Sequence, residues 1–304
     1  MNRSVSRTAA LAALLLAAAA MLTLPALTAA ASDANDAGVI VQAERRFAAQ
    51  VRAMGVRAGF LRWLAPTGVV FRPGPVIGRT SYEKQPPGWN GLLAWHPVHA
   101  AISADGTLGW STGPWTWKRD STQKKVDAFG EYMSVWRKQA DGSFRAVLDC
   151  GIGHADPARE ETEVHYSAPV PGARLGSRPL AARQSLYQAD ATFARIAATE
   201  GVSGAIARYA TDDIVVLREG AQRFSGRAVA QDSVRARERV AKMTSNAQYI
   251  ADSGDLGYTY GSYVTGTLAA PDSAYYVHVW HRGAAATWRL AFQVVMPVPK
   301  PAKK

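Results

Sequence analysis

The chain has 304 residues, of which 48% are hydrophobic and 19% are charged, and its formal net charge is +11. This length suits about two domains with ordinary buried cores. The basic residues are scattered, apart from a short tail at Lys300, Lys303 and Lys304, so they do not form the basic patch typical of nucleic-acid binding. We therefore expect no nucleic-acid partner, and only a general attraction to anionic surfaces.

The first 31 residues have the pattern of a secretory signal peptide. Arg3 and Arg7 precede an apolar run over 9–24, and Ala29 and Ala31 fit the small residues before a cleavage site. An uncleaved membrane anchor is the alternative, because the apolar run approaches the roughly 20 residues that span a bilayer. We predict cleavage after Ala31, a periplasmic or secreted location, and no membrane span in the mature chain.

The single cysteine, Cys150, has no partner for a disulfide, so an exported chain of this sequence depends on core burial for its stability. It lies in an apolar, strand-like run, which predicts a buried side chain. The sequence contains no Gly-x-Ser-x-Gly elbow, phosphate-binding loop, dinucleotide fingerprint or His-Glu-x-x-His motif. We therefore expect no cofactor and no metal.

An internal repeat covers most of the remaining chain. Matching residues occur in the same order at nearly constant offsets: Phe47 and Phe193 (193 − 47 = 146), Arg72 and Arg218 (218 − 72 = 146), Trp110 and Tyr258 (258 − 110 = 148), and Trp136 and Trp280 (280 − 136 = 144). A period this long indicates a duplicated domain and not a solenoid. We predict domains at 39–154 and 185–297, a proline-rich extended linker at 155–184 between them, and a basic tail at 298–304.

Within each copy the periodicity predicts helices first and strands afterwards. The expected helices are 41–54 and 61–64 in the first copy, and 185–199, 206–210 and 228–243 in the second. Gln85-Pro86-Pro87-Gly88 breaks the helix that would correspond to 228–243. The expected strands are 69–72, 93–102, 108–118, 131–138 and 144–152, then 214–218, 248–252, 257–266, 275–282 and 287–296. This order predicts an α+β fold, with the helices of each copy on one face of its sheet.

The second copy resembles the nuclear-transport-factor-2-like superfamily, in particular its SnoaL-like branch and the DUF4440 families. The resemblance rests on the helix that ends in a glycine, the strand entry Asp212-Asp213-Ile214-Val215-Val216, and the final strands with Val279-Trp280 and Trp288-Arg289. The first copy resembles the family more weakly. The resemblance implies a curved, mostly antiparallel sheet around a helix, which makes a cone-shaped pocket. Such domains often pair through their sheets, as an internal pseudo-dimer or a homodimer.

Ligand-binding residues follow partly from this resemblance. It places the catalytic base of the ketosteroid isomerases at Arg72 and Arg218, and their helical tyrosine at Ala48 and Ala194, so ketosteroid-isomerase chemistry is disfavoured. The two arginines could instead hold a carboxylate or phosphate between aromatic walls, which we expect from Trp110, Trp115, Tyr258 and Tyr263. The alternative is that the arginines lie at a solvated strand edge and the aromatic side chains form the core.

His99 and His278 are the candidates for a pocket acid or base. Each lies three residues from a second histidine, His96 or His281, and this spacing puts the two side chains on opposite faces of a regular strand, which does not suit a shared metal. We predict a protein that binds a small apolar or anionic ligand, or an envelope interaction module. The alternative is a SnoaL-like isomerase or lyase for a small apolar substrate, which needs a buried titratable side chain in the floor of a cone.

Overall fold

The computed structural model describes residues 36–86, 91–157, 161–167, 179–234, 240–267, 270–283 and 286–300. These residues fall within one compact unit, 33–304. The predicted signal peptide and the end of the predicted basic tail lie outside the described residues. None of the helices within these ranges combines the length and the apolar character needed to cross a membrane.

The strands form two sheets. The first contains β1 (Leu64–Phe71), β2 (Pro75–Ile77), β3 (Leu92–Trp95), β4 (His99–Ile102), β5 (Leu108–Lys118), β6 (Ala128–Lys138), β7 (Phe144–His154) and β8 (His165–Tyr166), in the order β2-β1-β7-β6-β5-β4-β8, with β3 also paired to β5. The second contains β9 (Ala210–Arg218), β10 (Phe224–Ser225), β11 (Val240–Ile250), β12 (Leu256–Thr267), β13 (Ala270–Arg282) and β14 (Trp288–Pro297), in the order β10-β9-β14-β13-β12-β11.

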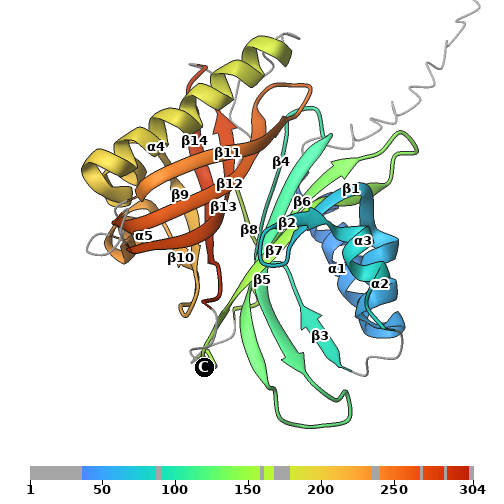
Figure 1. The fold of residues 1–304 in the computed structure, drawn as a ribbon. Coiled ribbons are helices and arrows are strands. Elements are labelled where there is room, and N and C mark those ends of the chain that lie inside the picture. Colours follow the sequence, from blue (N-terminus) through green and yellow to red (C-terminus); the bar gives the residue numbers. More distant parts are fainter. Residues whose placement is uncertain are drawn as a thin grey trace, which may run out of the picture. The chain divides into compact units, whose positions relative to one another are not determined.

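Each sheet has its own helices. Figure 1 shows α1 (Gly38–Met54), α2 (Val56–Trp63) and α3 (Gly78–Glu83) beside the first sheet, and α4 (Pro179–Tyr209) and α5 (Arg227–Val234) beside the second. The apolar stripe of α1 packs on the first sheet around Phe47 and Trp136, and that of α4 packs on the second around Phe193 and Trp280. The described chain is therefore an α+β structure with mixed sheets.

The two halves share details of backbone geometry. The first strand after the helices runs parallel to the last strand in both, in the pairs β1–β7 and β9–β14. The pairing shifts register at Val135–Trp136 and again at Val279–Trp280, which are 144 residues apart (279 − 135 = 144). Gly55 and Gly201 interrupt the helices with φ of 84° in both cases, a conformation that L side chains rarely adopt. The repeat in the sequence thus corresponds to a repeat in topology.

The faces of the two sheets that carry no helices share one hydrophobic core. Trp110, Met133 and Leu148 from the first sheet belong to the same buried cluster as Val279 and Phe292 from the second. Cys150 is buried in this cluster, as predicted. The sheets therefore pack face to face, with helices on their outer sides.

Several expectations about elements differ from the structure. The strand expected over 93–102 is two strands, β3 and β4, because residues 96–98 between them are not in a strand. The helix expected over 228–243 ends at Val234, because β11 already begins at Val240 and pairs with β12, so sheet pairing overrides the helical pattern. A short helix, α3, precedes Gln85 where none was expected. The expected linker at 155–184 contributes β8, which pairs with β4, and α4 begins at Pro179 instead of at Ser185.

Candidate functional site

A cavity of about 470 Å³ lies in the first half, between its helices and its sheet. Its walls are mostly aromatic and apolar, with a small number of polar groups among them, which is typical of small-molecule sites. The lining side chains include Phe60, Arg72, Tyr82, Leu93, Trp95, Trp115, Trp117, Tyr132 and Asp149.

Asp149 supplies the carboxyl group of this cavity. It lies on β7 between Val70 of β1 and Ser134 of β6, and the Ser134 hydroxyl donates a hydrogen bond of 2.9 Å to Oδ2. Burial and the nearby Glu44 raise the pKa of Asp149 to about 7, although Ser134 and Arg72 partly oppose the shift. At neutral pH this carboxyl group can therefore both take and give a proton.

Glu44 lies behind Asp149 and is fully buried. It occupies the apolar stripe of α1 between Ile40 and Phe47. Its carboxylate accepts hydrogen bonds from the Trp95 indole at 2.6 Å, the Ser111 hydroxyl at 2.6 Å and the Trp136 indole at 2.9 Å. Burial raises the pKa of Glu44, and these donors limit the shift because they stabilise the anion.

Two tyrosines and Arg72 provide hydrogen-bond donors beside Asp149. The Tyr132 hydroxyl is buried and has no hydrogen-bond partner among the described residues. The Tyr82 hydroxyl accepts a bond of 2.9 Å from the Arg72 guanidinium, which leaves its own proton free to donate. Burial raises the pKa of both tyrosines, so both hydroxyls stay protonated. The cavity thus combines one proton-transfer group with donors for an oxygen atom.

The second half has different side chains at the corresponding positions. Asp149 corresponds to Gln293 (293 − 149 = 144) and Glu44 to Asp190 (190 − 44 = 146). Arg218 donates to Gln293 Oε1, and the Gln293 amide lies 2.7 Å from Nε2 of His278. His278 Nδ1 lies 2.8 Å from Asp190, so a continuous chain of hydrogen bonds crosses this half. An amide in place of the carboxyl group cannot transfer a proton.

The residues predicted for the site lie in several places. Arg72 and Trp115 line the cavity of the first half. Trp110 and Tyr258 belong to the core between the sheets, and Tyr263 to the core under α4. Arg218 and His278 are members of the buried chain of the second half. His99 is buried against Trp110, with ring centroids 5.1 Å apart, and its Nε2 is 2.8 Å from the Ser167 hydroxyl.

The second histidine pair faces opposite sides of its strand, as its spacing predicts. His278 contacts Asp190 of α4, whereas His281 contacts Trp110 of the first sheet. His96 lies outside the strands, between β3 and β4, and its Nε2 is 2.7 Å from the carbonyl oxygen of Glu161. The described ranges contain no group of three or more His, Cys, Asp or Glu side chains that could hold a metal ion.

Acid should destabilise the contact between the sheets through His281. Burial lowers its pKa to about 4 from an ordinary value of 6.5. The folded state therefore favours the neutral ring. The stability that depends on the neutral ring is fully present above the pKa of His281 in the unfolded chain, and it is lost as the pH falls toward and through the pKa of His281 in the folded protein. We expect wild type to lose about 3 kcal/mol more than His281→Gln between about pH 7 and pH 4 in urea unfolding. Exposed His165→Gln is the control, and a loss of equal size in His281→Gln would contradict the assignment.

The acidic groups of the two interiors were not predicted from the sequence. Glu44 and Asp190 are single carboxylates within apolar helical stripes, and they are related by the same offset as the arginines. Asp149 is a single carboxylate within an apolar strand. Glu44 and Asp190 could have been identified from the sequence, because a charged side chain stands at a core position of the first copy and an acid stands at the same position of the second.

Several solved structures resemble part of this chain at low sequence identity. No family model and no curated protein matches the sequence. A solved NTF2-like protein of unknown function from Pseudomonas putida has 16% identity, covers 41% of this chain and 91% of its own, and has a TM-score of 0.34. A ketosteroid isomerase-like protein from Erwinia carotovora atroseptica has 15% identity, with 39% and 97% coverage and a TM-score of 0.33. ActVI-ORFA from Streptomyces coelicolor has 16% identity, 38% and 95% coverage, and a TM-score of 0.31.

Proposed function

We propose that the first half catalyses proton transfer on a small, mostly apolar molecule that carries a carbonyl or similar oxygen. The observation that carries this proposal is a carboxyl group with a pKa of about 7, Asp149, in an aromatic cavity beside the unpartnered hydroxyl of Tyr132. This corresponds to the isomerase or lyase alternative. We also propose that both halves are nuclear-transport-factor-2-like domains, and their shared topology supports this proposal.

The proposed chemistry needs only groups of this chain. Asp149 takes a proton from a carbon next to the carbonyl group, and the electron pair moves onto the oxygen. Tyr132 donates a hydrogen bond to that oxygen as its charge develops, in surroundings with little water to compete. Return of the electron pair and of the proton to another carbon completes an isomerisation. In an elimination, the electron pair returns to form a new C=C bond, the bond to a leaving group on the next carbon breaks, and Asp149 gives its proton to the departing group.

Binding without turnover is the second candidate. Arg72 lines the same cavity and can pair with a carboxylate or phosphate through its fork of N–H donors. The aromatic walls would hold the apolar part of such a ligand. In this case Asp149 would tune affinity through its charge, and a panel of ligands would bind without chemical change.

Deuterium exchange separates the two candidates. We expect the protein to speed exchange of the carbon-bound protons of some small cyclic or aromatic ketones in deuterated buffer, as followed by proton NMR. Asp149→Asn should abolish the exchange but retain ligand binding, and exposed Asp252→Asn should leave it unchanged. Binding without exchange would reject catalysis and favour the second candidate.

We further propose that the chain is exported and that its second half serves as the internal partner of the first. The signal-like residues before Ala31 support export. The core shared between the sheets supports an internal pseudo-dimer, since it covers the sheet face of both halves. Light scattering on the processed chain should then give the mass of a monomer, and a dimer would contradict this arrangement.

A further inference from the structure

A second and larger cavity, of about 1070 Å³, opens beside the first sheet. Four acidic side chains line it: Glu131, Asp156, Glu161 and Glu163. Among the described residues, two guanidinium groups, Arg52 and Arg223, balance them, so this part of the lining carries two negative charges when the carboxylates are ionised (2 − 4 = −2). The surplus of acid stands out in a chain whose formal net charge is +11.

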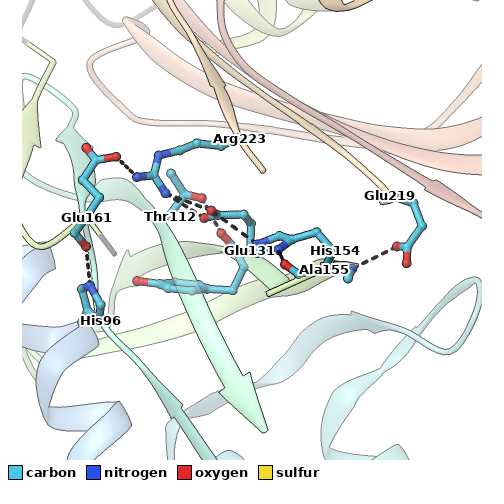
Figure 2. A network of polar contacts seen from close by, with 10 residues as sticks. His96, Thr112, Glu131, His154, Ala155, Glu161, Glu219 and Arg223 are labelled. Carbon is cyan, nitrogen blue, oxygen red and sulfur yellow. Dashed lines mark hydrogen bonds and ion pairs between the residues drawn. The ribbon is translucent and has the colours of Figure 1, made fainter. Parts of the chain in front are cut away.

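Arg223 is shared between two of these acids (Figure 2). Its Nη1 lies 3.0 and 2.9 Å from the two oxygens of Glu131, and its Nη2 contacts Glu161. The side chains of Arg223 and Glu131 are only 9% and 4% exposed. One guanidinium group thus serves two carboxylates, and one negative charge of this cluster stays unbalanced.

His154 adds an independent sign that the cavity takes a ligand. Its side chain is 2% exposed and lines the cavity, and its Nε2 has no hydrogen-bond partner among the described residues. Nδ1 lies 2.6 Å from the carbonyl oxygen of Ala155, which can only accept, so Nδ1 carries the proton. In the neutral ring Nε2 is therefore an acceptor, and it lies 3.9 Å from another acceptor, Oε1 of Glu131. Nε2 of His154 therefore lacks a donor that a ligand can provide, whereas Oε1 of Glu131 already accepts from Arg223 and can accept a further hydrogen bond.

We propose that this cavity binds a small organic cation, specifically an aryl-alkyl ammonium ion. Its N–H groups donate to His154 Nε2 and to Glu131, and its ring packs on Trp115 and Phe129, which also line the cavity. Aromatic faces attract cations, and the acidic lining repels anions. A metal ion is a poorer fit, since the described residues contain no cluster of three or more suitable ligands.

Calorimetric titration of the purified chain with 2-phenylethylammonium tests the proposal. The neutral analogue 2-phenylethanol and the anion 3-phenylpropionate serve as matched probes. We expect the ammonium ion to bind with one-to-one stoichiometry and at least about tenfold more tightly than the alcohol, since its charge meets two unbalanced carboxylates. Higher salt should weaken the ammonium binding alone.

Two exposed acids of the lining allow variants that do not disturb the core. The double variant Asp156→Asn, Glu163→Gln should weaken ammonium binding about tenfold, at roughly threefold for each exposed charge. The matched control is Glu83→Gln, which removes an exposed carboxylate outside the lining. Asp149→Asn should leave ammonium binding unchanged. The ammonium proposal and the proton-transfer proposal can therefore fail independently of each other. No binding of the ammonium ion, equal binding of the alcohol, or an unchanged double variant would overturn the proposal.

Discussion

Replacement of Asp149 by asparagine should make the protein more stable at alkaline pH than wild type. The folded pKa of Asp149 is about 7, against an ordinary value of 3.8. Because its pKa is raised, Asp149 keeps a proton in the folded state at pH values where the unfolded chain has lost it. The stability that depends on this proton is fully present below the pKa of Asp149 in the unfolded chain, and it disappears as the pH rises through the pKa of Asp149 in the folded protein. Wild type should therefore lose roughly 3 kcal/mol between about pH 4 and pH 8 that the Asn variant does not lose.

Urea unfolding followed by tryptophan fluorescence at several pH values measures this difference. The histidine contributions are the same in both proteins and cancel in the comparison. Asparagine can still accept the hydrogen bond from Ser134, so the two proteins should have similar stability near the acid end. Exposed Asp252→Asn is the control and should follow wild type at every pH. A difference between wild type and Asp149→Asn that stays constant from acid to alkaline pH would show that Asp149 titrates normally.

The cost of an ionised Asp149 also bears on function. A buried carboxyl group that costs stability at neutral pH is rarely retained for packing, because an amide of the same shape avoids the cost. Gln293 in the second half shows that the fold accepts an amide at this position. The two halves therefore differ where proton transfer would take place, and the first half alone keeps the titratable group.

The sequence predicted the order of elements because amphipathic helices and alternating strands leave a clear periodic pattern. It did not predict that Val240 begins a strand, since the pairing with β12 depends on residues far along the chain. The repeat identified the candidate arginines and aromatic residues, but it did not predict where their side chains are buried. Trp110 and Trp115 are only five positions apart on one strand (115 − 110 = 5) and lie on different sides of the sheet, in a core and in a cavity. Only coordinates reveal which face of a sheet another sheet covers.

Removal of Asp190 should be among the most damaging single changes in the second half. The carboxylate is 2% exposed and accepts hydrogen bonds from Thr259 at 2.9 Å, Tyr276 at 2.7 Å and His278 at 2.8 Å. Asp190→Ala leaves these donors buried without a partner and opens a small void under α4. We expect a loss of about 4 kcal/mol in the free energy of unfolding, because each unmet buried donor costs about 1–3 kcal/mol and the neighbours relax in part.

Asp190→Asn separates the hydrogen bonds from the charge. The amide oxygen can still accept from Thr259 and His278, and the Tyr276 hydroxyl can rotate to accept from the amide nitrogen. The loss should then be about 1–2 kcal/mol, well below that of the alanine variant. Exposed Asp252→Ala should change stability by less than about 0.5 kcal/mol. Equal losses for Asp190→Ala and Asp190→Asn in chemical unfolding would contradict this account. They would mean that the negative charge of Asp190, and not its hydrogen bonds with the three donors, stabilises the second half, so that Asp190 acts as an ion-pair partner and not as the end of a hydrogen-bond chain from Arg218.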